Sequence, residues 1–312
     1  MKAFLFPGQG SQAVGMARDL FERNEAARAV MERANTVLGF DLTDIMFGSG
    51  SEETADTDKA ILTRTQNTQP ALFVHSMAVM TALPRHASTP DMVAGHSLGE
   101  YSALAAAGVI SFEEGLCIVR LRGELMAQAG DIRPGAMAAI LGMEDADVEA
   151  LCSDASGEGI VQPANFNSPG QIVISGDVEA VEKAVELAPD RGARRVLKLP
   201  VSGAFHSPLM DFARDGLAEA LDSLPIHTPT CPVYLNVTAA PTTDPEEIRA
   251  RLVEQLMSPV RWAQSLTAMQ ADGASRFVEI GAGKVLSGLV KRTLGRDVET
   301  VSLSTAADLE TL

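Results

Sequence analysis

The sequence predicts an α/β protein with a mainly parallel sheet and a smaller inserted domain. Short apolar strands alternate with amphipathic helices in both the first and the last third of the chain, which is typical of a parallel sheet covered by helices. Between about residues 130 and 200 the order becomes β-α-β-β-α-β, the ferredoxin-like unit. We therefore expect a large domain of residues 1–128 and 199–312, interrupted by a ferredoxin-like small domain of residues 129–198.

The predicted elements of the large domain follow from apolar spacing and from the residues that interrupt it. The first strand, for example, stops at Pro7-Gly8. Strands are expected at residues 3–6, 91–95, 232–237, 276–280 and 299–303. Helices are expected at residues 17–38, 68–83, 98–107, 112–129, 208–224, 246–257, 260–269 and 284–294, and the helices at 17–38 and 112–129 should end at Gly39 and Gly130.

The small domain should contain two helices, at residues 145–155 and 177–188, the second with Asp177 as its N-cap. Its second and third strands are joined by Asn167-Ser168-Pro169-Gly170, a strong turn signal. The expected strands cover residues 136–141, 160–164, 171–175 and 194–199.

Composition excludes several classes of protein. The 312 residues are 46% hydrophobic and 21% charged, which is ordinary for a globular protein. With 25 basic and 41 acidic residues the net charge is −16, so the chain is a poor nucleic-acid binder. The longest apolar stretch, residues 92–110, is interrupted by polar side chains, and we expect no membrane span.

Cysteine usage and the absence of metal motifs narrow the chemistry. Cys117, Cys152 and Cys231 are far apart and form no CxxC pair, which fits free thiols in a reducing cytoplasm. Gly281-Ala282-Gly283-Lys284 lacks the first glycine and the Ser/Thr of a phosphate-binding P-loop, so we interpret it as a helix start. We expect neither a metal nor a tightly bound cofactor.

Gly95-His96-Ser97-Leu98-Gly99 matches the G-x-S-x-G pattern between a predicted strand and a predicted helix. That context is the one a nucleophile elbow requires, because the glycines allow a sharp turn that lifts the serine oxygen clear of the sheet. The helix dipole would add a positive potential at the same point. The alternative is a tight turn whose serine only caps the helix.

A nucleophilic serine needs a base, and His206 is the best placed of the five histidines. It follows a predicted strand and precedes a predicted helix, at the edge where open α/β sheets build their sites. Its alternative role is to cap the next helix. His75 lies inside a helix, His86 and His227 lie in loops, and His96 should diverge from its neighbour Ser97.

The first predicted strand runs into Pro7-Gly8-Gln9-Gly10, a second glycine turn at the carboxyl end of a strand. The next glycine, Gly15, comes too late for a dinucleotide fingerprint. A free N–H in this turn could donate to an oxyanion, together with the N–H of Leu98. A plain turn between strand and helix is the alternative.

Four segments together resemble the malonyl-CoA:acyl carrier protein transacylases of fatty-acid synthesis and the acyltransferase domains of polyketide synthases. They occur in the family's order and span nearly the whole chain: Phe6-Pro7-Gly8-Gln9-Gly10-Ser11-Gln12, Gly95-His96-Ser97-Leu98-Gly99-Glu100, Gly203-Ala204-Phe205-His206-Ser207 and Gly281-Ala282-Gly283-Lys284-Val285-Leu286. The resemblance implies a hydrolase-like large domain beside the ferredoxin-like one. It also implies transfer of a malonyl group from malonyl-CoA to the phosphopantetheine thiol of acyl carrier protein through an acyl-serine, supplying extender units for fatty-acid or polyketide synthesis.

The resemblance implies a role for each matching position. Ser97 would be the nucleophile and His206 the base, with the backbone N–H groups of Gln9 and Leu98 as the oxyanion hole. Arg122 follows the serine at the family's spacing and would bind the malonyl carboxylate; otherwise it is a surface arginine on a helix.

Two further segments extend the resemblance. The backbone carbonyl of Gln255 would hold the histidine in place of a triad acid. Gly203-Ala204-Phe205-His206 resembles the polyketide signature for malonyl, whereas methylmalonyl domains tend to carry Tyr-Ala-Ser-His there.

An acidic chain that receives an acidic carrier protein needs a local basic surface. We suggest two clusters for carrier docking, although basic side chains scattered on a solvated surface are the alternative. The residues are Arg191, Arg194, Arg195, Lys198, Lys284, Lys291 and Arg292.

Two other functions remain open. A serine esterase or thioesterase would want a carboxylate between Ser97 and a final histidine, but Asp177 and Asp190 fall in the predicted small domain. A non-catalytic module that binds carrier protein is the second, and the presence of both Ser97 and His206 argues against it.

Overall fold

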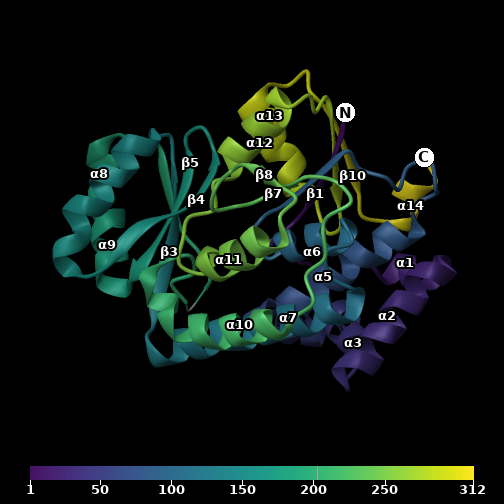
Figure 1. The fold of residues 1–312 in the computed structure, drawn as a ribbon. Helices are drawn as coiled ribbons and strands as arrows, with labels where there is room; N and C mark the ends of the chain where they lie inside the picture. Colours follow the sequence, from purple (N-terminus) through teal and green to yellow (C-terminus); the bar gives the residue numbers. More distant parts are fainter. Residues whose placement is uncertain (202) are drawn as a thin grey trace.

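The computed structural model describes residues 1–201 and 203–312, and it contains two β-sheets (Figure 1). The larger is a six-stranded sheet in the order β10-β9-β1-β2-β7-β8, in which every neighbouring pair is parallel except β7 and β8. Its strands are β1 (Lys2–Phe6), β2 (Met92–Gly95), β7 (Val233–Tyr234), β8 (Pro241–Thr242), β9 (Arg276–Ile280) and β10 (Glu299–Leu303). The predicted mainly parallel sheet is confirmed.

Alternate side chains of β1 enter two different hydrophobic clusters, so both faces of the large sheet are covered. Phe4 and Phe6 join the cluster that includes helices α5 to α7, and Ala3 and Leu5 join the cluster that includes α12 and α13. The helices of this part of the chain are α1 (Arg18–Arg23), α2 (Glu25–Leu38), α3 (Leu42–Phe47), α4 (Ala55–Thr63), α5 (Thr65–Ala82), α6 (Gly99–Ala106), α7 (Phe112–Ile132), α10 (Asp211–Ser223), α11 (Pro245–Gln255), α12 (Trp262–Ala271), α13 (Val285–Leu294) and α14 (Ala306–Leu309).

The smaller sheet is antiparallel, with strands in the order β4-β5-β3-β6, as in a ferredoxin-like unit. Its elements are β3 (Gly135–Leu141), α8 (Asp145–Ala155), β4 (Val161–Ser168), β5 (Gln171–Asp177), α9 (Val178–Leu187) and β6 (Arg195–Lys198). In β3, Ala138 and Ile140 pack with the cluster under α8 and α9, whereas Met137 and Ala139 pack with the large-sheet cluster. Both sheets fall inside the segments expected for the two domains, and the domain boundaries themselves stay a prediction.

Strand β4 also binds the backbone just before α12. The N–H of Phe166 donates to the carbonyl of Val260 at 2.9 Å, and the N–H of Val260 donates to the carbonyl of Ala164 at 2.8 Å. Main-chain hydrogen bonds therefore connect the small sheet to the segment that precedes α12.

Several predicted elements differ in detail from the observed ones. The expected helix 17–38 is two helices, because Asn24 adopts an extended conformation and its side chain accepts the N–H of Ala27 to start α2. Helix α7 continues through Gly130 to Ile132. Asp177 precedes α9, but its carboxylate binds Arg133 and the N–H of Ile160 instead of capping the helix. Helices α3, α4 and α14 and strand β8 were not predicted.

Strand β7 is shorter than the predicted strand 232–237, because the chain turns at Leu235, whose carbonyl accepts the N–H of Ala239. Within the described residues, no helix combines the length and the apolar character needed to cross a membrane.

Candidate active site

Ser97 lies in a tight turn between β2 and α6. Its φ of 51° is in the left-handed region, which a residue with a side chain seldom adopts. Glycine is needed on both sides: a Cβ on Gly95 would lie 1.9 Å from the Gly99 carbonyl, and a Cβ on Gly99 would lie 2.0 Å from the Phe6 carbonyl. The turn therefore has the predicted elbow geometry, pressed against the end of β1.

Asn236, just after β7, holds this turn from the side. Its Oδ1 accepts the backbone N–H of Ser97 at 2.7 Å, and its Nδ2 donates to the carbonyl of Gly95 at 2.7 Å. One buried amide thus satisfies the peptide groups on both sides of His96 and fixes the conformation of Ser97.

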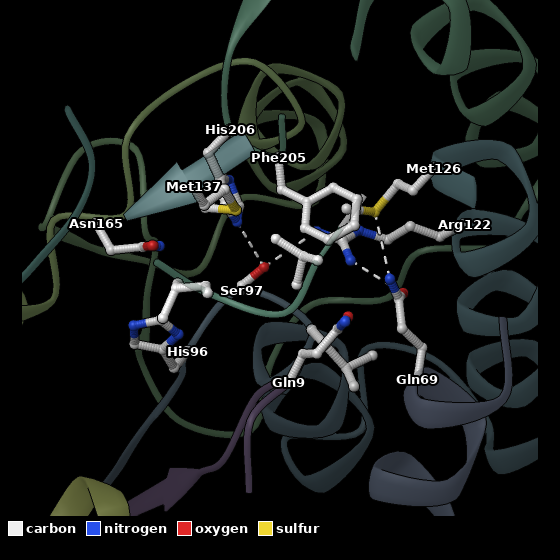
Figure 2. Close-up of a pocket in the computed structure, with 13 residues that line it drawn as sticks. Gln9, Gln69, His96, Ser97, Arg122, Met126, Met137, Asn165, Phe205 and His206 are labelled. Atoms are coloured by element: carbon white, nitrogen blue, oxygen red, sulfur yellow. Dashed lines mark hydrogen bonds between the residues drawn. The ribbon is translucent and has the colours of Figure 1, made fainter. Parts of the chain in front are cut away.

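His206 lies between β6 and α10 and also has a left-handed backbone, with φ of 59°. Its Nε2 is 2.8 Å from Ser97 Oγ (Figure 2). Its Nδ1 is 2.8 Å from the backbone carbonyl of Gln255 at the end of α11. Gln162 on β4 donates to the backbone carbonyl of His206 at 2.9 Å, so the small sheet also positions this residue.

The surroundings of His206 favour its neutral form. Burial, and then the nearby charge of Arg122, lower its pKa to about 3. Since the Gln255 carbonyl can only accept, Nδ1 carries the hydrogen and Nε2 is left with a lone pair that faces the Ser97 hydroxyl. The pair is arranged for transfer of the serine proton to His206.

Arg122 projects from α7 into the same cavity although its side chain is only 1% exposed. Its Nη1 donates to Oε1 of Gln69 at 2.9 Å, and its Nη2 donates to Oε1 of Gln255 at 2.9 Å and to Ser97 Oγ at 3.2 Å. No Asp or Glu among the described residues lies within ion-pair distance of this guanidinium. A buried cation with neutral partners is ready to bind an anionic group.

The cavity around these three side chains is lined by apolar groups from α7, β3 and the segment before His206. Figure 2 shows Met126, Met137 and Phe205 around the Ser97 hydroxyl, with Gln9 at the opposite wall. Leu98 also lines the cavity. A second, more polar hollow, lined by Arg64, Thr65, Gln66 and Asp131 among others, adjoins it and shares Gln9, Met126, Val201 and Phe205 as lining residues.

Gly8 explains how Gln9 reaches the cavity. A Cβ at Gly8 would lie 2.3 Å from the carbonyl of His96, so only glycine lets the turn after β1 approach the elbow. The turn that carries Gln9 therefore lies against the elbow that carries Leu98. No cluster of three or more His, Cys, Asp or Glu side chains arranged to hold a metal ion occurs in the described part of the chain.

The basic residues suggested for docking do not form one patch: some are ion-paired, and others line separate hollows. Arg191 is paired with Asp154 and Lys198 with Glu182. Arg194 and Arg292, from the two ends of the predicted patch, line one open groove beside the β4–β5 turn. Lys284 and Lys291 line another hollow, and Arg195 is exposed on β6.

Sequence reasoning gave no role to Asn236 or Gln69, whose side chains bind the elbow and Arg122, and Glu100 entered it only as the last residue of a motif. Asn236 is the second-last residue of the predicted strand 232–237, and Gln69 lies in the polar first turns of α5 beside Asn67 and Thr68, so neither position stands out in the sequence. The remaining histidines lie apart from the Ser97 hydroxyl; His75 binds the Ser304 carbonyl, and His96 turns away to Asn167.

Comparison with known proteins places this geometry in a family. The model of the acyl transferase domain matches residues 3–308. The malonyl CoA-acyl carrier protein transacylase of Bacillus subtilis (strain 168) is 46% identical over 309 residues, covering 99% of this chain and 95% of the relative.

Solved structures agree. The acyl-carrier-protein-S-malonyltransferase of Bartonella henselae superposes with a TM-score of 0.92 at 42% identity, covering 99% of this chain and 97% of that one. A malonyl-transacylase solved in complex with a type II PKS acyl-carrier protein gives a TM-score of 0.91 at 39% identity, with 99% and 98% covered. The buried Ser97–His206 pair thus lies in a chain that belongs to the acyl transferase family.

Proposed function

We propose that this protein transfers a malonyl group from malonyl-CoA to the phosphopantetheine thiol of acyl carrier protein through an acyl-serine intermediate. One observation carries the proposal: Ser97 Oγ lies 2.8 Å from a buried imidazole and 3.2 Å from a buried guanidinium. The first can activate the hydroxyl, and the second can hold the free carboxylate of malonyl. The names of the relatives support the same substrates.

The first half-reaction forms the acyl-serine. His206 Nε2 takes the Ser97 proton while Oγ attacks the thioester carbonyl, which gives a tetrahedral oxyanion. The C–S bond then breaks, and coenzyme A leaves with the proton returned by His206. The carbonyl of Gln255, bound to Nδ1, stabilises the imidazolium that exists between these steps.

The second half-reaction reverses the first with a new thiol. The phosphopantetheine thiol gives its proton to His206, and its sulfur attacks the ester carbonyl. The C–O bond breaks, and Ser97 recovers the proton. The backbone N–H groups of Gln9 and Leu98 are the proposed donors to both oxyanions, each contributing about 2.7–4 kcal/mol if it acts like other such donors.

Arg122 supplies the preference for malonyl in this proposal. Its planar fork can donate two parallel hydrogen bonds to a carboxylate. Acetyl-CoA brings no carboxylate, so the cation would stay buried without an anionic partner. Met126, Met137 and Phe205 leave little room beside the reacting carbonyl, in keeping with a small acyl group.

The carrier partner is proposed to dock on the basic groove beside the β4–β5 turn. Arg194 and Arg292 lie in this groove without an acidic ion-pair partner among the described residues, whereas Arg191 and Lys198 are already paired. The reaction serves fatty-acid or polyketide synthesis. Three free cysteines favour a cytoplasmic location, and no cofactor takes part in the proposed steps.

An esterase or thioesterase is not favoured by the site. The Nδ1 partner of His206 is a carbonyl instead of a carboxylate, and a hydrolase has no evident use for the buried Arg122. A non-catalytic carrier-binding module has no need for an activated hydroxyl.

Intact-protein mass spectrometry tests the proposal. The protein is mixed separately with acetyl-, malonyl- and methylmalonyl-CoA, and we expect a covalent adduct chiefly with malonyl-CoA, discharged by holo acyl carrier protein. Ser97→Ala should give no adduct, and Ser102→Ala, on α6 directly after the elbow, should behave as the native protein does. An adduct that persists in Ser97→Ala would refute the acyl-serine.

A further inference from the structure

Glu100 is a buried carboxyl group that the proposed reaction leaves without a role. It lies in the first turn of α6, three residues after Ser97, and it is 1% exposed. Its Oε2 accepts the backbone N–H of Asn236 at 2.9 Å and Nε2 of Gln255 at 3.1 Å. It forms no ion pair with any described residue. Burying a carboxylate with only neutral hydrogen-bond donors costs folding free energy, which points to a specific role for Glu100.

The Gln255 side chain connects Glu100 to Arg122. An ionised carboxylate can only accept hydrogen bonds, so the NH₂ end of the Gln255 amide must face Glu100. The same NH₂ group donates to the carbonyl of Ser97 at 3.1 Å. The oxygen end then faces the opposite way and accepts Nη2 of Arg122 at 2.9 Å. The acceptors at Glu100 and Ser97 thus orient the Gln255 amide so that its oxygen faces Arg122.

In this arrangement Glu100 stabilises the buried Arg122 cation without forming an ion pair with it. Direct contact with Glu100 would neutralise Arg122 and compete with a substrate carboxylate. Burial raises the pKa of Glu100 to about 7 and lowers the pKa of Arg122, so at pH 8 Glu100 is mainly ionised. Placed one amide away, each charge offsets part of the effect of burial on the other. The guanidinium keeps its position, and no Asp or Glu of the described residues occupies the place of an anionic ligand.

We propose that Glu100 is a positioning residue for the substrate carboxylate: through the Gln255 amide it orients Arg122 and balances its charge, and so supports the selection of malonyl over uncharged acyl groups. This inference rests on the proposed function, because it takes malonyl as the group that Arg122 receives.

The test is Glu100→Gln, which keeps the size of the side chain and removes its charge. Acylation of Ser97 is measured at pH 8 with malonyl-CoA, acetyl-CoA and an uncharged fluorophosphonate that labels activated serines. We expect kcat/KM for malonyl-CoA to fall about ten-fold or more, mainly through KM, because Arg122 loses a fixed partner. Acetyl transfer and fluorophosphonate labelling should stay within about two-fold, since His206 still binds the Gln255 carbonyl.

Glu279→Gln is the matched control. Glu279 is another fully buried glutamate, on β9, whose carboxylate accepts the N–H groups of Leu286 and Ser287 at the start of α13 at 2.9 and 2.8 Å, and it does not line the cavity. We expect this variant to lose stability with no change in the ratio of malonyl to acetyl transfer. Thermal unfolding of both variants separates loss of folding from loss of selectivity.

Gln255→Leu keeps the backbone carbonyl for His206 but removes the amide. It should show the same loss of selectivity as Glu100→Gln, and combining the two should add little more, because both break one connection. An unchanged malonyl-to-acetyl ratio in a folded Glu100→Gln, or equal losses with all three reagents, would overturn the inference. Failure of the native protein to be acylated by malonyl-CoA would instead reject the proposed function.

Discussion

Ser97 and His206, 109 residues apart, face each other across 2.8 Å, and each has a left-handed backbone. Residues with side chains adopt this conformation at a cost of about 1–3 kcal/mol, so neighbouring groups must hold it. For Ser97 that group is Asn236, and for His206 it is Gln162 on the small sheet together with the Gln255 carbonyl. The reacting pair is therefore assembled by residues from both sheets.

Asn236→Ala should loosen the elbow. It leaves the Ser97 N–H and the Gly95 carbonyl without their partner, which we expect to cost about 1–3 kcal/mol of stability and to slow acylation about ten-fold or more. The measurements are chemical denaturation and single-turnover acylation. Asn24→Ala, which removes only the N-cap of α2, should cost about 1 kcal/mol and leave the acylation rate unchanged. Equal rates in the two variants would contradict the role of Asn236.

Arg122→Ala should remove selectivity more than activity. Malonyl transfer is expected to fall about 100-fold or more, because a buried charged contact is lost, whereas acetyl transfer should change much less. Steady-state kcat/KM values for the two thioesters check this. Arg120→Ala is the control: it lies on the same helix but binds Glu124 and the Gln66 carbonyl instead of entering the cavity. Equal losses with both thioesters would argue against carboxylate binding.

The protonation of His206 gives a prediction for stability against pH. Its folded pKa, about 3, is below the unfolded value of about 6.5, so the unfolded chain binds one more proton between these limits. Stability should therefore decrease as pH falls from about 6.5 toward 3, by at most about 1.4 kcal/mol per pH unit from this group.

His206→Asn, an amino acid that tolerates left-handed backbone, should show a shallower decrease over the same pH range. Denaturant midpoints at a series of pH values measure the difference. His75 and His96, whose pKa values burial also lowers, are present in both proteins and cancel. Parallel curves for the native protein and the variant would show that His206 titrates normally.

Charge reversal tests the docking surface. Arg194→Glu with Arg292→Glu should raise KM for the carrier protein about ten-fold while leaving acylation by malonyl-CoA unchanged, because neither side chain lines the cavity around Ser97. Increasing salt should weaken carrier binding to the native protein more than to this variant. Arg33→Glu, on α2, is the control because Arg33 already pairs with Glu113. An unaltered KM would remove this surface from the proposal.

The sequence predicts most of the fold because its strands and turns have local signals. The strand 276–280 and the helix 145–155 match β9 and α8 to the residue. At Asn24 the prediction was wrong. The apolar spacing continues through this residue, but its side chain caps α2 and so ends one helix and begins the next.

The two residues proposed to react carry local sequence signals, whereas the residues that hold them carry none. Ser97 is marked by its glycines and His206 by its place after a strand. Glu100, Gln69 and Asn236 act through hydrogen bonds between segments distant in sequence, and no local pattern records such partners.

The main-chain hydrogen bonds that connect β4 with Val260 limit how substrates arrive. If the small sheet moved away from the large one, the main-chain hydrogen bonds at Phe166 and Val260 would have to break. The hydrogen bond from Gln162 to the His206 carbonyl would break as well. Opening the cleft widely would thus disrupt the contact between Ser97 and His206. A narrow pantetheine chain can pass Phe205 without breaking these hydrogen bonds. This fits a protein whose acyl donor and acceptor both end in a pantetheine chain.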